Sequence, residues 1–318
     1  MKLSVIIPVL NEEDSIEKLN DQIHSILTEN EINKFEVLFI DDGSRDNSWI
    51  IIKSLVEKHP QTVRGIKLRR NFGKSTALNA GFKNTSGDIV ITMDADLQDD
   101  PFEIPNFIQK INEGYDLVSG WKKIRHDPLH KVIPSKIFNF MTRSLSGIRL
   151  NDFNCGYKAY RREVVEKIDL YGELHRYIPV LVAGFGYRIT EIPVKHRSRG
   201  FGKSKFGIER YFRGFVDLLT VLTITNYNQK PSHFFAGLGV FFGLIGTIIL
   251  SYLIILWFAG FGPIGNRPLL LFGILAIVLA VQLVSLGVLS EIMLQNMRKD
   301  VVKDYIHEME GFKKPKLE

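Results

Sequence analysis

Two long apolar stretches near the end of the chain place the strongest constraint on its fold. Residues 234–258 form 25 consecutive positions without a charge, and residues 269–290 form another 22. At about 1.5 Å per helical residue, each stretch can cross a hydrocarbon layer about 30 Å thick. The sequence therefore predicts two transmembrane helices and excludes a purely soluble protein. Gln282 lies inside the second stretch and is expected to hydrogen-bond to a neighbouring helix, with the lining of a cavity as the alternative.

Basic residues gather beside these stretches. Residues 195–230 carry a net charge of +6, which equals the formal charge of the whole chain, and Arg298, Lys299 and Lys303 follow the second stretch. The connector between the stretches contains a single basic residue, Arg267. The positive-inside rule then predicts that both termini lie in the cytoplasm and that the connector lies outside. Residues 195–230 are also suited to hold anionic lipid head groups.

The first 120 residues or so alternate strand-like and helix-like segments. Short runs rich in Val and Ile, typical of strands buried on both faces, are residues 3–9, 37–41, 65–68 and 89–93. Helical patterns lie between and after them at residues 15–28, 48–57, 75–83 and 102–112. The alternation predicts an α/β fold, a Rossmann-like, mostly parallel sheet with helices on both faces. Later segments are predicted as a helix (131–146), an extended piece (153–160), a strand (187–192) and an amphipathic helix on the bilayer surface (210–225).

Acidic and amide side chains follow three of the predicted strands. The clusters are Asn11-Glu12-Glu13, Asp41-Asp42-Gly43-Ser44 and Asp94-Ala95-Asp96-Leu97-Gln98-Asp99. Each alone would suit a turn that caps a helix, but ligands bind where parallel strands end, so three together predict a binding site. In an extended segment, Asp94, Asp96 and Gln98 would share one face and offer oxygen atoms to a hard cation. Phosphate oxygens would complete the shell of Mg²⁺ or Mn²⁺.

With three further motifs, these clusters resemble the polyprenyl-phosphate glycosyltransferases. The further motifs are Asn71-Phe72-Gly73-Lys74, Asp152-Phe153-Asn154-Cys155-Gly156-Tyr157-Lys158 and His196-x-x-Arg199-x-x-Gly202-x-Ser204-Lys205. That group of inverting family 2 enzymes with the GT-A fold includes dolichol-phosphate mannose synthase and the bactoprenol glucosyltransferases. The resemblance implies a cytoplasmic catalytic domain over residues 1–205 and a juxtamembrane amphipathic helix over residues 206–230. Two transmembrane helices with a short external loop (231–291) and a cytoplasmic tail (292–318) follow.

The resemblance also implies roles for individual residues. The nucleotide would lie along Pro8, Asn11, Glu13, Asp42, Lys74 and Asp94. Mg²⁺ or Mn²⁺ would be held on the diphosphate by Asp94, Asp96 and Gln98, and the catalytic set would be Asp94, Asp96 and Asp152. Asp152 would orient the sugar or the acceptor, with a turn cap as its alternative role. The acceptor phosphate would meet Arg199, Lys203 and Lys205, followed as candidates by Lys122, Arg125 and Lys136.

The predicted activity is the transfer of a hexose, with inversion, from a nucleotide sugar to polyprenyl (undecaprenyl) phosphate at the cytoplasmic membrane face. UDP-glucose is the expected donor, and GDP-mannose or another UDP-sugar is the alternative. No nucleic-acid partner is expected, and a homo-oligomer is left open. Competing interpretations are a processive polysaccharide synthase, a nucleotide-sugar-binding scaffold without turnover and a pore or flippase formed by the two spans. Cys155, the single cysteine, is expected to be a packed residue and not a nucleophile.

Overall fold

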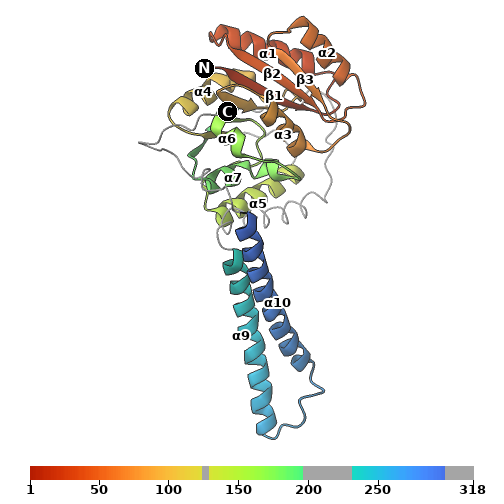
Figure 1. The fold of residues 1–318 in the computed structure, drawn as a ribbon, viewed down its shortest axis with the longest axis vertical. Helices are drawn as coiled ribbons and strands as arrows, with labels where there is room; N and C mark the ends of the chain where they lie inside the picture. Colours follow the sequence, from red (N-terminus) through yellow and green to blue (C-terminus); the bar gives the residue numbers. More distant parts are fainter. Residues whose placement is uncertain (124–128, 196–230, 298–318) are drawn as a thin grey trace. The chain divides into compact units, whose positions relative to one another are not determined.

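A computed structural model describes residues 1–123, 129–195 and 231–297 of the chain. The predicted helix over residues 210–225 and most of the predicted cytoplasmic tail lie outside these ranges. The chain divides into two compact units, Met1–Leu222 and Thr223–Glu318. The first is built on one seven-stranded sheet and the second on two long helices (Figure 1).

The first part of the sheet unit alternates strands and helices, as predicted. Its elements are β1 (Leu3–Val9), α1 (Ile16–Glu29), β2 (Phe35–Asp41), α2 (Ser48–Lys58), β3 (Val63–Lys67), α3 (Lys74–Asn84) and β4 (Ile89–Thr92). The four strands pair in parallel in the order β3-β2-β1-β4. Their carboxyl ends therefore lie along one edge of the sheet, where the three polar clusters follow.

The second part of the unit extends the sheet with a change of strand direction. Its elements are η1 (Pro101–Glu103), α4 (Ile104–Asn112), β5 (Leu117–Trp121), α5 (Leu129–Ser146), β6 (Lys158–Arg161), α6 (Arg162–Lys167), η2 (Leu174–Arg176), α7 (Ile178–Gly184) and β7 (Ile189–Pro193). The order continues β4-β6-β5-β7, and β6 runs antiparallel to both β4 and β5. Only the last residues of the segment predicted as extended, 153–160, form a strand. The loop before β6 consequently meets the edge where β4 ends.

Apolar side chains pack on both faces of the sheet. In β1, Val5 and Ile7 belong to the core that includes residues of α1, α2 and α4, whereas Ile6 belongs to the core that includes residues of α3, α6 and α7. Because each central strand buries both faces, its sequence is a continuous apolar run. The predicted fold, a mostly parallel sheet covered by helices on both faces, is confirmed.

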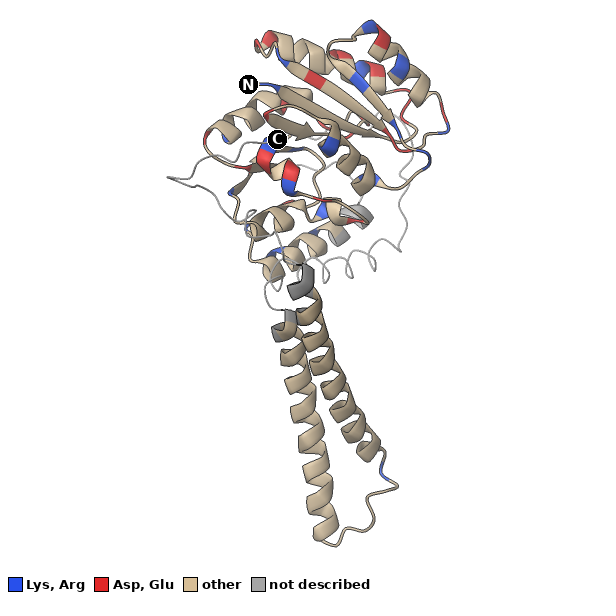
Figure 2. Cartoon of the chain, in the orientation of Figure 1, with Lys and Arg blue, Asp and Glu red and all other residues tan. Residues whose placement is uncertain are grey.

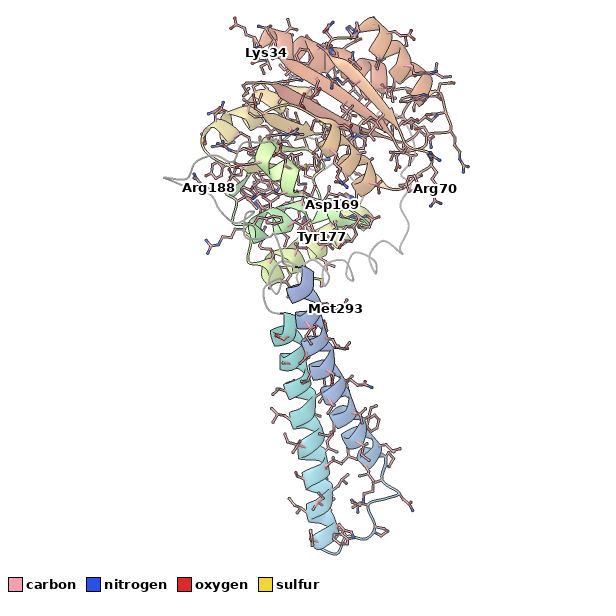
Figure 3. The ribbon with its side chains drawn as sticks, in the orientation of Figure 1. Lys34, Arg70, Asp169, Tyr177, Arg188 and Met293 are labelled. Carbon is pink, nitrogen blue, oxygen red and sulfur yellow. The ribbon has the colours of Figure 1, made fainter. Side chains whose placement is uncertain are left out.

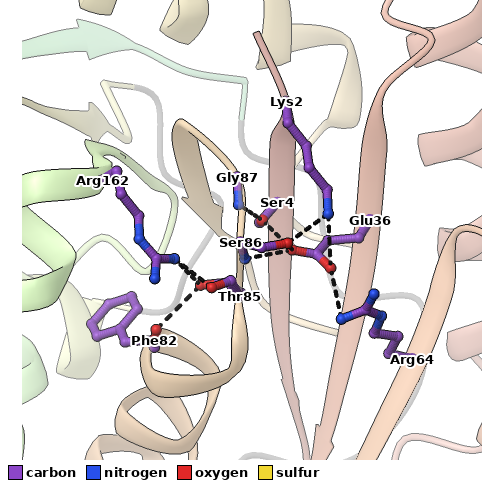
Figure 4. A network of polar contacts seen from close by, with 9 residues as sticks. All are labelled: Lys2, Ser4, Glu36, Arg64, Phe82, Thr85, Ser86, Gly87 and Arg162. Carbon is purple, nitrogen blue, oxygen red and sulfur yellow. Dashed lines mark hydrogen bonds and ion pairs between the residues drawn. The ribbon is translucent and has the colours of Figure 1, made fainter. Parts of the chain in front are cut away.

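A buried carboxylate, Glu36 in β2, ties together the end of the strands away from the polar clusters (Figure 4). It accepts hydrogen bonds from the Ser4 hydroxyl at 2.7 Å and from the Ser86 backbone N–H at 2.8 Å. Lys2 and Arg64 form ion pairs with it at 3.6 and 3.3 Å. Burial raises the pKa of Glu36, but the hydrogen bonds and Lys2 outweigh burial and leave the pKa below its usual value. Glu36 therefore stays ionised and links three neighbouring strands.

The second unit is a pair of long apolar helices, α9 (Pro231–Phe258) and α10 (Pro268–Met297). Phe234–Phe258 and Pro268–Ser290 are long and apolar enough to cross a membrane, and neither stretch contains a charged side chain (Figure 2). The helices approach closely, since a Cβ added to Gly246 would lie 2.9 Å from the Gly273 carbonyl oxygen. Close backbone approach at small residues is typical of helix packing in membranes.

Replacing Glu36 with Ala is expected to reduce the free energy of unfolding by about 2–4 kcal/mol, because Ser4, Lys2 and Arg64 lose their shared acceptor. A carboxylate with a depressed pKa stabilises the fold above its unfolded-state pKa, and this contribution disappears as the pH falls through the folded-state pKa. The difference between wild type and variant should thus shrink on acidification. Thermal unfolding of the full chain in detergent, from neutral to acidic pH, measures it. Glu57→Ala, at an exposed position on α2, is the control, and equal melting temperatures for all three proteins would contradict the expectation.

Candidate active site

The loops that follow β1 and β2 are joined by hydrogen bonds from backbone to side chain. The Asn11 side chain accepts one from the Arg45 N–H at 2.7 Å, and Glu13 accepts one from the Asn47 N–H at 2.9 Å. Asn11 has a φ of 51°, in the left-handed region that asparagine tolerates. Pro8 is half-buried in β1. Two of the predicted nucleotide-binding side chains thus also hold the shape of this sheet edge.

Asp42 connects the end of β2 to the loop that leads into α3. Its carboxylate accepts hydrogen bonds from the backbone N–H groups of Phe72 at 2.8 Å and Gly73 at 2.9 Å. Burial raises the pKa of Asp42, although these two hydrogen bonds oppose the shift. The loops pack so closely that a Cβ on Gly43 would lie 2.5 Å from the Arg70 carbonyl carbon. The edge at β1, β2 and β3 is therefore a set of interlocked turns.

Two lysines and two aspartates form a chain of alternating charge at the same edge, which we name the charge chain (Lys74, Asp94, Lys122 and Asp99). Lys74, the first residue of α3, pairs with Asp94 after β4. Lys122, directly after β5, pairs with Asp99 at 3.2 Å. The backbone N–H of Asp94 also donates a hydrogen bond to the Asp99 carboxylate at 3.2 Å. Residues from three separate parts of the sequence meet here because their elements end at one edge.

The members of the charge chain stabilise one another's ionised forms. Burial raises the pKa of Asp94, but the charges of Lys74 and Lys122 outweigh it and hold the pKa well below its usual range. Burial lowers the pKa of Lys122, yet Asp99 keeps that pKa well above its usual value. The side chains of Lys74 and Asp94 are 30% and 33% exposed, whereas that of Asp99 is 1% exposed. The Lys74–Asp94 end is thus the accessible part of the charge chain.

The segment Asp152–Lys158 lies directly against the Lys74–Asp94 pair. A Cβ added to Gly156 would lie 2.9 Å from both Asp94 Oδ1 and Lys74 Nζ. Thr92, the last residue of β4, donates a hydrogen bond to the Gly156 carbonyl oxygen at 2.8 Å. A side chain at position 156 would therefore displace the ends of Lys74 and Asp94 from their present positions.

Lys158, the first residue of β6, is buried and binds the backbone of the segment Asp152–Lys158. Its buried ammonium donates hydrogen bonds to the backbone carbonyls of Phe153, at 3.2 Å, and Cys155. Burial lowers the pKa of Lys158. The sequence predicts no role for this residue, because lysine is seldom buried. The one sequence feature that could have pointed to Lys158 is its position at the end of the motif that begins at Asp152.

Two other residues of the segment are buried as well. Asp152 is 1% exposed and accepts a hydrogen bond from the Asn154 N–H at 3.1 Å, an arrangement typical of a turn. Cys155 is also buried, and burial raises the pKa of its thiol to about 12. The prediction that Cys155 is a packed residue is confirmed. The predicted role of Asp152 toward the sugar or the acceptor stays a prediction.

A further polar contact, absent from the sequence predictions, joins α3 to η2. The Ser75 hydroxyl and His175 Nδ1 lie 2.9 Å apart, and the His175 backbone N–H donates to the same hydroxyl at 3.1 Å. His175 also contributes to the depressed pKa of Asp94. Histidine and serine 100 residues apart carry no local pattern that could reveal this contact.

The segment with Asp96 and Gln98 turns, so the prediction that it is extended is wrong. Leu97 has a φ of 61°, and the Gln98 N–H donates to the Asp96 carboxylate at 3.2 Å. Asp94 is already paired with Lys74. Within residues 1–123, 129–195 and 231–297, no group of three or more His, Cys, Asp or Glu side chains is placed to hold a metal ion. Asp96 and Gln98 are hard oxygen donors that fit Mg²⁺ or Mn²⁺ provided that other oxygens complete the shell.

The residues predicted to meet the acceptor phosphate have different positions. Lys122 belongs to the charge chain, where it pairs with Asp99. Lys136 is exposed on α5. The remaining candidates lie outside the described residues, and they are Arg125, Arg199, Lys203 and Lys205.

Comparison with known proteins gives consistent matches. A family model described as "Glycosyl transferase family 2" matches residues 4–169, which include the charge chain and the segment Asp152–Lys158. The dodecaprenyl-phosphate galacturonate synthase of Rhizobium johnstonii is 35% identical over 311 residues, covering 96% of this chain and 92% of that protein. The undecaprenyl-phosphate 4-deoxy-4-formamido-L-arabinose transferase of Shewanella sediminis is 38% identical over 291 residues, covering 91% and 86%.

A solved structure shares the fold of the sheet unit. The glucosyl-3-phosphoglycerate synthase of Mycobacterium tuberculosis, in complex with Mn²⁺, uridine diphosphate and phosphoglyceric acid, matches with a TM-score of 0.51. It is 21% identical, and the match covers 70% of this chain and 77% of that chain. At this identity the likeness concerns the arrangement of helices and strands alone.

Replacing Gly156 with Ala is expected to reduce the activity of this site by on the order of 10- to 100-fold, because the new Cβ forces Lys74 and Asp94 out of position. The melting temperature should change little, since the displaced side chains are accessible. Nucleotide affinity and reaction rate, measured beside the melting temperature, test this expectation. Gly265→Ala, at a position with open space around it, is the matched control. Wild-type affinity and rate in the Gly156 variant would show that the Lys74–Asp94 geometry does not matter.

Proposed function

The chain belongs to glycosyl transferase family 2, and we propose that it transfers a sugar from a nucleotide sugar to a polyprenyl phosphate at a membrane surface. One observation carries the choice of acceptor. Relatives that match 96% and 91% of the chain are named as a dodecaprenyl-phosphate galacturonate synthase and an undecaprenyl-phosphate 4-deoxy-4-formamido-L-arabinose transferase. A lipid acceptor also explains why a sheet domain is joined to two helices that are apolar enough to cross a membrane.

The donor diphosphate is proposed to lie beside the accessible Lys74–Asp94 pair, with the nucleoside along Asn11, Glu13 and Asp42. Two features support this. Lys74 is the accessible cation of the charge chain, and a diphosphate needs a cation beside it. The interlocked loops around Asn11 and Asp42 are at the carboxyl ends of β1 and β2, where ligands of parallel sheets bind.

A divalent cation is proposed to complete the donor site, held by Asp96 and Gln98 with Asp94 close by. These side chains provide too few ligands on their own, so diphosphate oxygens and water would supply the others. When bound, Mg²⁺ or Mn²⁺ would neutralise the charge that develops on the leaving diphosphate. Lys74 and Lys122 add positive charge from the protein itself.

The chemistry requires no strong base. An oxygen of the acceptor phosphate attacks the anomeric carbon, the bond from that carbon to the donor diphosphate breaks, and the electron pair leaves with the nucleoside diphosphate. Attack from the opposite side inverts the anomeric configuration. Because the phosphate is ionised, no proton has to be removed. Asp152, which is buried in a turn, is therefore proposed to position the segment beside the sugar and not to act as a base.

UDP-glucose as the donor stays a prediction from sequence. The two relatives are named for galacturonate and for 4-deoxy-4-formamido-L-arabinose, so they give glucose no support. The cytoplasmic position of the sheet unit and of both termini is likewise proposed from the distribution of basic residues.

Membranes that contain the chain should form labelled lipid when they are incubated with polyprenyl phosphate and one of several radiolabelled donors, namely UDP-glucose, UDP-galacturonate and GDP-mannose. Asp96→Asn is expected to lower the rate by on the order of 100-fold or more and to weaken Mn²⁺ binding measured by paramagnetic resonance. Asp21→Asn, at an exposed position on α1, is the control. If no donor gives labelled lipid, the chain is better explained as a binding scaffold. If Asp96→Asn keeps full activity, Asp96 is not a ligand of the metal ion.

Arg199→Ala is expected to raise the acceptor KM or to lower the turnover by about tenfold or more, and Arg199→Lys should fail similarly because a point charge cannot make a two-pronged contact. Lys195→Ala, which removes a charge next to anionic lipid only, should lose much less. Initial rates against acceptor concentration at saturating donor measure these effects, with nucleotide affinity determined separately. Equal small losses in all three variants would mean that the basic segment only adheres to lipid.

A further inference from the structure

Gln282 in α10 lies near the middle of the apolar stretch Pro268–Ser290, and its side chain is exposed. α10 packs on α9 through the opposite side, where Ala280 is buried and its carbonyl oxygen would lie 2.9 Å from a Cβ on Gly239. Two residues along a helix correspond to a rotation of about 200°. Gln282 therefore points away from α9, and the sequence prediction of a bond to a neighbouring helix is not met within this hairpin.

No hydrogen-bond partner for the Gln282 amide exists among the residues that the structure describes. The hydroxyl groups of two other residues in the spans, Thr247 and Ser285, are satisfied by their own helix. Thr247 donates to the Gly243 carbonyl at 2.7 Å, and Ser285 donates to the Val281 carbonyl at 2.9 Å. In hydrocarbon, a primary amide without a partner is unfavourable by several kcal/mol. Gln282 thus requires a partner from outside the part of the chain that the structure describes.

The face of α10 that carries Gln282 has a spacing suited to a second helix. Side chains project from α10 along its length (Figure 3). The members of this face are exposed and recur at alternating intervals of four and three residues, and they are Leu271, Leu275, Val278, Gln282, Ser285, Leu289 and Ile292. This is the heptad spacing of helices that pack side by side. Any face of such an apolar helix contains apolar residues at this spacing, so the Gln282 amide is the feature that distinguishes this face. We name these seven residues the Gln282 face.

We propose that the Gln282 face pairs with the same face of a second copy of the chain, with the two Gln282 amides bonded to each other. Copies inserted in one membrane share an orientation, so a twofold axis along the membrane normal brings identical residues together at the same depth. A primary amide is both a donor and an acceptor, so two of them satisfy each other reciprocally. The small Ser285 next to them leaves room for close approach.

A second copy fits this face better than the other occupants. Lipid tails and polyprenyl chains are hydrocarbon and offer no hydrogen-bond partner to an amide. A twofold arrangement provides a partner of the correct chemistry at the correct depth without a further protein. The proposal rests on the membrane insertion proposed above and is independent of the transferase activity.

The first test measures association of the full chain in bilayers of neutral lipid. Copies labelled with donor and acceptor fluorophores are reconstituted over a range of protein-to-lipid ratios, after alkaline extraction has established insertion. Gln282→Leu is expected to weaken dimerisation by about tenfold, and Gln282→Asn to keep it. Thr247→Val, which removes a hydroxyl satisfied within α9, is the matched control and should leave dimerisation unchanged.

A second test locates the interface independently of stability. Single cysteines introduced by Val278→Cys and Ser285→Cys should form crosslinks between copies, whereas Val281→Cys and Val288→Cys on the adjacent face should not. The wild-type chain, whose single cysteine Cys155 is buried, gives the background level of crosslinking. An inserted and active chain that stays monomeric, or dimers that are unaffected by Gln282→Leu, would overturn the pairing and leave the proposed function intact. A chain that is not inserted would instead contradict the membrane part of the proposed function.

Discussion

The pairing of Lys74 with Asp94 is the interaction on which the rest of the candidate site depends. One partner begins α3 and the other follows β4, so the pair forms only when the parallel sheet has brought their elements to one edge. Gly156 leaves the space that the pair occupies, and Lys158 holds the carbonyls of the loop that contains this glycine. A change at any of these four positions disturbs the same small volume.

The charge chain is better explained by chemistry than by stability. A buried ion pair often contributes little net stability, because removing two charges from water offsets their attraction. Here Asp99 and Lys122 are almost enclosed, while Lys74 and Asp94 remain about one-third exposed. The enclosed pair fixes the local charge, and the accessible pair is where an anionic ligand and a cation can compete for the same groups. In the proposed reaction, those competitors are the donor diphosphate and its divalent cation.

One end of the strands carries a structural network around Glu36, and the other end carries the candidate site. Glu36 accepts hydrogen bonds from a hydroxyl group and a backbone N–H and pairs with two cations, which suits a purely structural network. At the other end, Asp96 and Gln98 lie in a turn with hard oxygen donors that suit a cation only when further ligands join them. Gln282 presents the same contrast inside the spans, since it differs from Thr247 and Ser285 in lacking a partner within its own helix.

Local patterns in the sequence determined the fold class, the two apolar helices and the place of the candidate site. Alternating apolar and amphipathic segments identify β1 to β4 because hydrophobic periodicity is a property of neighbouring residues. The short strand β5, which contains Ser119 and Gly120, lacks such a pattern. The motifs also located Asp94, Lys74 and the segment Asp152–Lys158. Three features were decided by the tertiary structure alone. Lys122 forms an ion pair with Asp99, the chain turns at Leu97 between Asp96 and Gln98, and Gln282 faces away from α9. Those outcomes depend on which elements become neighbours, and no local stretch of sequence contains that information.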